Sequence, residues 1–160
     1  MPPGLIRRLM DRAEELLLVA LFVLMFVISF ANVVARYFLR FALAFTEEMV
    51  LAAFVWATLL GTATVVRRGA QLAFTFLVDR GSRPTRRLAL WLSSTATVVV
   101  FGALAYYGVQ QVELERRLGF TTEALALPQW WYTAGVPAFA VWVVFRVLQA
   151  AWELDRTLRA

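Results

Sequence analysis

The chain has 160 residues, 61% of them hydrophobic, and a formal net charge of +5, with a mean hydropathy of +0.69. A soluble domain is nearer half apolar, so this composition indicates a protein that resides in lipid. Cysteine and histidine are absent, which excludes disulfides, thiolate metal sites and imidazole ligands for haem. The basic residues are all arginine and lie scattered between apolar runs, so we expect no nucleic-acid partner.

Four long apolar runs divide the chain, at about residues 16–35, 47–66, 88–112 and 128–146. Each is near the roughly 20 residues that a helix needs to cross a bilayer. The sequence therefore predicts an all-α integral membrane protein, in which residues 1–160 form a single membrane domain of four transmembrane helices with short interfacial amphipathic helices. The first run is too long for the apolar part of a signal peptide, so we expect it to remain as the first span.

The segment before the first span is polar and is expected, from about Leu5, to form an amphipathic helix at the membrane interface. Glu14 and Glu15 end this segment, and we expect them to stay interfacial. Arg36 closes the first span. The stretch 36–45 that begins there is aromatic and basic, which suits the headgroup layer.

The second span opens with a polar start. Thr46 is placed to cap the free backbone N–H groups, and Glu47 and Glu48 fall in the first turn, where the helix dipole favours carboxylates. Two interpretations of the acids stay open: they only complement the dipole, or they also pair with basic groups of a partner subunit. Trp56 faces a partner, lipid or another helix of the chain, and Gly61 is expected to be a close-packing position.

Arginines 67 and 68 end the second run. Residues 69–80 are apolar but too short to span, so we expect a second interfacial helix there. Residues 81–87 hold Gly, Pro and three arginines, which predicts a loop. The third span, 88–112, follows this loop, and charged residues close it.

The fourth span is expected to start with Pro128 in its first turn, where the missing N–H costs nothing. Residues 130–132 (Trp, Trp and Tyr) are typical of an aromatic belt at the membrane surface. Pro137 lies inside the run and predicts a kink. The tail 146–160 is expected to continue as an amphipathic helix.

Arginine placement predicts the orientation. The N-terminal segment, the middle connection and the tail hold twelve arginines, and the other two connections hold four. The positive-inside rule then places both termini and the middle connection in the cytoplasm.

The centres of the four runs contain no ionisable residue, and every acid or arginine is expected at a helix end or in a loop. A pump or proton-coupled antiporter needs a buried carboxylate on its path. We therefore expect neither a pump nor an enzyme, and no catalytic, cofactor-binding or metal-binding residue. Hydroxyls within the runs are expected to bond to their own helix, or else across helices, and Gly102 and Gly108 to pack closely.

Three stretches give the chain a resemblance to a known family: residues 32–63, 65–80 and 123–148. In order and spacing they resemble the small membrane subunit of tripartite ATP-independent periplasmic (TRAP) transporters, the DctQ-like family. The residues that match the family pattern are Arg36, Glu47, Glu48, Trp56, Gly61, Asp79, Pro128 and Pro137. Two positions depart from it: Phe45, where the family usually has Trp, and Gln71, where it often has His.

The resemblance implies a scaffold subunit in a bacterial inner membrane. Its partners would be a large permease subunit, which carries the Na⁺ and substrate sites, and a periplasmic binding protein that delivers an organic acid anion. No cofactor is implied. The alternative is a self-contained small transporter, or a pore formed by oligomerisation, which would need a polar helix face through the bilayer. Only the third span hints at such a face. A lipid-modifying enzyme would need interfacial carboxylate or histidine clusters, and the sequence has none.

Overall fold

A computed structural model describes residues 5–40, 43–67 and 83–159. Their elements are α1 (Leu5–Val34), the π-helical segment η1 (Ala35–Leu39), α2 (Phe45–Arg67), α4 (Arg83–Leu118), α5 (Trp130–Thr133) and α6 (Gly135–Arg159). Four helical stretches are long and apolar enough to cross a bilayer: Leu9–Phe38, Phe45–Val66, Leu88–Leu118 and Trp130–Glu153. The prediction of an all-α membrane protein with four spans is confirmed.

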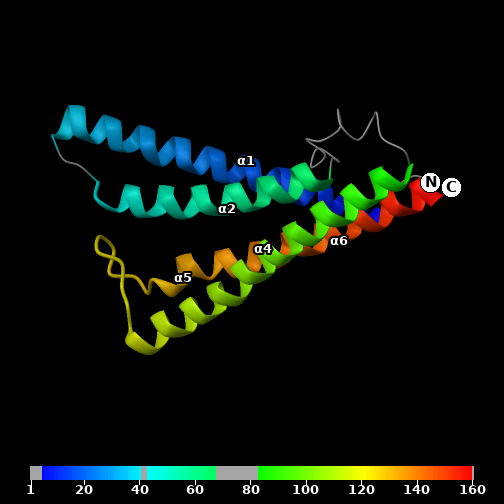
Figure 1. Cartoon of the computed structure of the whole chain (residues 1–160). Helices are drawn as coiled ribbons and strands as arrows, with labels where there is room; N and C mark the ends of the chain where they lie inside the picture. The colour runs from blue at the N-terminus through cyan, green and yellow to red at the C-terminus, as the bar shows by residue number, and fades with distance from the viewer. Residues whose placement is uncertain (1–4, 41–42, 68–82, 160) are drawn as a thin grey trace.

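The helices form two hairpins, α1 with α2 and α4 with α6, and α2 packs against α6 to join them. Figure 1 shows that the start of α1 and the end of α6 lie together at one end of the molecule. The end of η1, the start of α2 and the connection 119–129 lie at the other end, where the hairpins separate. We call these the joined end and the open end.

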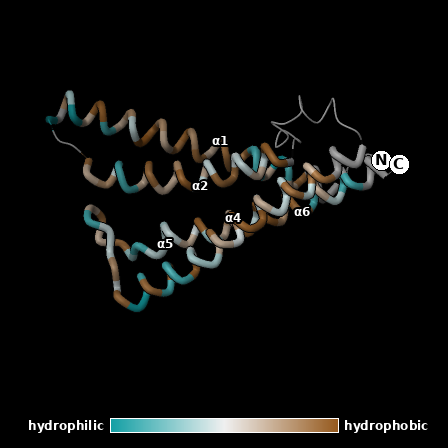
Figure 2. The backbone as a smooth tube through the Cα atoms, in the orientation of Figure 1, coloured by the Kyte–Doolittle hydropathy of each residue, from teal (hydrophilic) through white to brown (hydrophobic). Residues whose placement is uncertain are grey.

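Two small apolar clusters form the core. One lies between α1 and α2 around Leu21, Ala53 and Leu60, and the other joins α2 to α6 through Ala63 and Val143. Alanines at these contacts let the helix backbones approach closely. Large apolar side chains are instead exposed on the outer faces, as expected for surfaces that meet lipid: Phe22, Phe26 and Phe30 on α1, and Leu92, Val99 and Val100 on α4. Brown, hydrophobic stretches accordingly run along the helices in Figure 2.

The helix ends agree in part with the predictions. The interfacial lead-in and the first span are one continuous helix, α1, and α6 continues to Arg159, as expected for the tail. The predicted loop 81–87 is wrong from Arg83 onward, because α4 already begins there. Pro84 fits in the first turn of α4, where its missing N–H is no loss. The expected interfacial helix 69–80, with Asp79, lies outside the described residues.

The fourth span begins differently from the prediction. Pro128 does not start the helix but precedes α5 and pairs with Thr121 in an isolated antiparallel bridge. A break at Ala134 separates α5 from α6, three residues before Pro137. Pro137 cannot donate to the carbonyl of Thr133, and its ring crowds that carbonyl, which explains the break. The structure thus has an interruption between two helices just before Pro137, and the expected kink stays a prediction.

Candidate functional site

The predicted acid pair lies in the first turn of α2, at the open end. Glu47 is exposed. Glu48 is partly buried, and its Oε1 accepts a hydrogen bond of 2.8 Å from the backbone N–H of Ala124 in the connection 119–129. Its Oε2 is closed off from solvent and has no hydrogen-bond partner among the described residues. Two acids that are adjacent in sequence therefore have different surroundings: Glu48 fastens the connection to α2, and Glu47 points outward.

Thr46 does not cap α2 as predicted. Its Oγ1 donates to the carbonyl of Leu43 at 2.6 Å, and its backbone N–H donates to the same carbonyl at 3.1 Å. The N–H of Leu43 in turn donates to Oδ1 of Asn32 at 2.9 Å. The turn between the first two spans is thus tied to α1 by an asparagine that the sequence did not single out.

Trp56 contacts another helix of the same chain. Its Nε1 donates to the carbonyl of Tyr132 at 3.1 Å, and its ring lies 6.2 Å from that of Phe139. The carbonyl of Tyr132 is one of the last in α5, where the helix offers no N–H partner. Gly135 makes this approach possible, because a Cβ there would overlap the indole ring. Gly135 could not be identified from the sequence, because nothing in the neighbouring sequence indicates a close contact there.

The connection 119–129 is itself hydrogen-bonded. Gly119, with φ +66°, ends α4 in the left-handed conformation that glycine favours. The backbone N–H of Thr122 donates to the carbonyl of Leu127 at 2.8 Å, and the backbone N–H of Gln129 donates to the carbonyl of Phe120 at 3.0 Å. These bonds, with that to Glu48, give the connection a defined shape at the open end.

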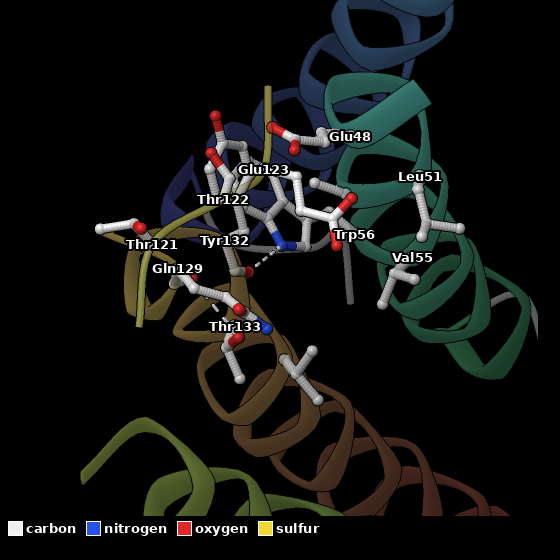
Figure 3. Close-up of a pocket in the computed structure, with 12 residues that line it drawn as sticks. Glu48, Leu51, Val55, Trp56, Thr121, Thr122, Glu123, Gln129, Tyr132 and Thr133 are labelled. Atoms are coloured by element: carbon white, nitrogen blue, oxygen red, sulfur yellow. Dashed lines mark hydrogen bonds between the residues drawn. The ribbon is translucent and has the colours of Figure 1, made fainter. Parts of the chain in front are cut away.

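A cavity of about 430 Å³ lies between α2, this connection and the start of the fourth span. Its polar lining residues are Glu48, Thr121, Thr122, Glu123, Gln129, Tyr132 and Thr133, and its apolar ones include Leu51, Val55 and Val136. Figure 3 shows these side chains gathered around the indole of Trp56. Of the described residues that line the cavity, two are carboxylates and none is basic.

A buried carboxylate lies near the end of α4. The side chain of Glu115 accepts hydrogen bonds from Gln111 at 3.0 Å and from Gln129 at 3.4 Å. Next to it, the guanidinium of Arg116 lies 4.8 Å from the centre of the Trp130 ring. These contacts hold the start of the fourth span against α4.

The largest departure from the predictions is a buried ion cluster between α1 and α6. The side chain of Arg146 is 1% exposed; its Nε contacts Glu14 at 2.5 Å and its NH2 contacts Asp11 at 2.9 Å. Trp142 donates to the same Glu14 carboxylate at 2.6 Å. Glu14 is therefore buried between two helices, and these charged groups lie within helices instead of at helix ends. The interfacial depth of Glu14 stays a prediction. The available signal was a pair of opposite charges beside the first and last spans, on the same predicted side of the membrane.

The other predicted positions are scattered. Arg36 is exposed within η1. Gly61 and Gly102 have no atom within 4 Å of a Cβ built on them, so neither packs against another described helix, whereas a Cβ built on Gly108 would lie 3.1 Å from the Pro137 ring. Four hydroxyls bond to their own helix as predicted: Thr58, Thr62, Thr64 and Thr97.

These features define a class of protein. The described residues contain no group of three or more acids that could hold a metal ion. The buried charges of Asp11, Glu14 and Arg146 compensate one another. The chain is a multi-pass helical membrane protein whose polar contacts brace one helix against another.

Comparison with known proteins gives the family. Residues 25–157 match the family of tripartite ATP-independent periplasmic transporters, DctQ component, and the chain belongs to that family. The chain is 27% identical to the C4-dicarboxylate TRAP transporter small permease protein DctQ of Rhodobacter capsulatus, over 94% of this chain and 79% of that protein. It is 26% identical to the sialic acid TRAP transporter small permease protein SiaQ of Vibrio cholerae, over 96% of this chain and 88% of that protein.

A third relative is much longer. The chain is 24% identical to the sialic acid TRAP transporter permease protein SiaT of Haemophilus influenzae, over 88% of this chain but only 22% of that protein. In that relative, a region similar to most of this chain is one part of a larger permease.

Proposed function

We propose that the chain is the small scaffold subunit of a TRAP-type secondary transporter in a bacterial inner membrane. It pairs with a large permease subunit, and the complex takes up an organic acid anion, coupled to Na⁺ and delivered by a periplasmic binding protein. The observation that carries this proposal is the match of residues 25–157 to the family. The permease that includes a region similar to this chain supports the pairing.

The internal bracing supports the role of a scaffold. Arg146 holds α6 to α1, Trp56 holds α2 to α5, and Glu48 holds the connection 119–129 to α2. The buried ionic groups of the Arg146 cluster are engaged with one another instead of lining a path for a solute. The transport sites are therefore assigned to the large subunit.

The residues of the family pattern divide by accessibility. Glu47 and Arg36 are exposed, so they are the members placed to contact a second protein. Gly61 has open space beside it, which suits close approach of a helix from outside the chain. Trp56 and Pro137 make contacts within the chain and act by shaping it.

Reconstitution tests the proposal. Liposomes that contain this chain alone should show no Na⁺-driven uptake of C4-dicarboxylates or sialic acid. Uptake of one organic acid should require the large permease and the binding protein from the same genome as well. The Glu47→Gln variant should co-purify less well with the permease at low salt, because it removes an exposed charge at the contact. Uptake by the chain alone would contradict the proposal and favour a pore formed by oligomerisation.

A further inference from the structure

The cavity at the open end holds negative charge that no described residue balances. Glu48 and Glu123 both line it, and no ion pair between described residues involves either carboxylate. The Glu48 oxygens have one hydrogen bond between them, from Ala124, although a carboxylate can accept about four. A partly desolvated carboxylate without a counter-charge is costly. The cavity therefore favours a cation and repels an anion.

The lining favours an organic ammonium group over a metal ion. No group of three or more acids that could bind a metal occurs among the residues that the structure describes. The cavity instead offers hydroxyls on Thr121, Thr122 and Thr133, which can accept hydrogen bonds. The indole of Trp56 also lines the cavity (Figure 3), and an aromatic face attracts an ammonium group.

The cavity also has an apolar side. Glu48, Leu51 and Val55 are spaced three and four residues apart on α2, so they follow one another along one helix face. Leu51 is 66% exposed, and Val136 lies across from this stripe in the first turn of α6. Starting at the polar connection, the cavity thus becomes apolar toward the middle of the helices. A phospholipid changes in polarity in the same direction, from its headgroup at the membrane surface to its acyl chains in the hydrocarbon.

The geometry points to a binding site for an aminophospholipid, whose primary ammonium group lies between Glu48 and Glu123 and whose acyl chain follows Leu51 and Val55. A primary ammonium brings three N–H donors, as a lysine side chain does, and can bond both carboxylates. A choline headgroup carries the same charge but has no N–H to donate. A glycerol headgroup leaves the phosphate charge uncompensated, and both carboxylates repel it. This inference requires only a bilayer and does not depend on the proposed transport function.

Native mass spectrometry of the purified chain in detergent tests the inference. The protein is offered phosphatidylethanolamine, phosphatidylcholine and phosphatidylglycerol with identical chains, at equal concentrations. Phosphatidylethanolamine should bind most tightly and phosphatidylglycerol least. The Glu48→Gln, Glu123→Gln double variant keeps the shape of both side chains but should lose about tenfold or more in affinity for phosphatidylethanolamine, since it removes two charge-assisted hydrogen bonds.

Glu47→Gln is the matched control. It neutralises the neighbouring acid in the same helix turn, but Glu47 is exposed and does not line the cavity, so lipid binding should not change. Circular dichroism should show equal helix content in all variants. Equal binding of the three lipids, or equal loss with the control and the double variant, would overturn the inference. An arginine or lysine of a neighbouring protein would then be the counter-charge that the cavity binds.

Discussion

Single polar and charged residues connect the helices of this protein in addition to its two apolar clusters, and Arg146 is the clearest case. Its side chain is 1% exposed and meets two carboxylates from α1, Asp11 and Glu14, while its guanidinium lies 5.3 Å from the centre of the Trp142 ring. Arginine suits such a place because its fork of donors can bond several acceptors at once. The stabilising interaction between α1 and α6 is thus concentrated in one charged cluster.

Arg146→Met should therefore destabilise the protein by about 3–5 kcal/mol, because it leaves the carboxylate of Glu14 buried without its counter-charge. The double variant Glu14→Gln, Arg146→Met removes both charges and should recover a large part of the loss. Thermal unfolding in detergent, followed by circular dichroism, measures both. Arg117→Met is the control, since Arg117 pairs with Glu113 on the exposed face of α4, and such pairs contribute little. Equal destabilisation by the single and double variants would show that packing, not charge, holds this site.

At the scale of elements, periodicity and length predicted which helices follow one another along the chain. They could not predict which helices contact one another. The apolar runs gave four spanning helices because a bilayer requires about 20 apolar residues of each. The proline at 137 gave the interruption before α6, since its effect on backbone hydrogen bonding is local. The break itself leaves carbonyl groups at the end of α5 without helical partners.

The roles of individual polar residues could not be predicted in the same way. Thr46 and Glu48 were both assigned to the start of α2. Thr46 bonds back to Leu43, and Glu48 reaches Ala124, which is 76 positions away in sequence. Glu14 was assigned to the interface because it precedes the charge-free run, and its partner Arg146 is 132 positions away. A pattern within one segment cannot show which distant segment will complete its hydrogen bonds.

Gly135→Ala tests the contact between α2 and the break in the fourth span. The added Cβ would overlap the Trp56 indole, so the ring has to move and its hydrogen bond to Tyr132 is lost. We expect a loss of about 1–3 kcal/mol, as for other overpacked sites, and a shift of the tryptophan fluorescence spectrum. Gly102→Ala is the control, because nothing lies within 4 Å of a Cβ there. An unchanged melting temperature for Gly135→Ala would mean that Trp56 does not pack on this glycine in the membrane.

At the scale of the whole molecule, both termini and the neighbouring ends of α2 and α4 lie at the joined end, and the two other connections lie at the open end (Figure 1). An even number of spans requires this arrangement. The distribution of arginines indicates which end faces the cytoplasm, and we propose that it is the joined end. The connection 119–129 then lies on the periplasmic side, with the cavity beside it.

Single cysteines test this orientation without background, because the natural chain has none. Ser82→Cys should react with a membrane-impermeant maleimide only after the cytoplasmic side is made accessible. Thr121→Cys, in the exposed connection, should react in intact spheroplasts. Denatured samples, in which both cysteines react, provide the control for labelling. The opposite pattern would reverse the proposed orientation.

The length of α4 has a mechanical consequence. Its 36 residues correspond to about 54 Å at 1.5 Å per residue, well beyond the roughly 30 Å of hydrocarbon in a bilayer. The last turns, which contain Glu115 and carry the connection 119–129, therefore extend toward the aqueous phase as a rigid arm. A push on the connection acts at the tip of this arm and also reaches α2 directly, through the hydrogen bond between Ala124 and Glu48. A tilt of α4 that is small near the joined end becomes a large displacement at the tip, so a protein that docks there has a long lever on the membrane-embedded helices.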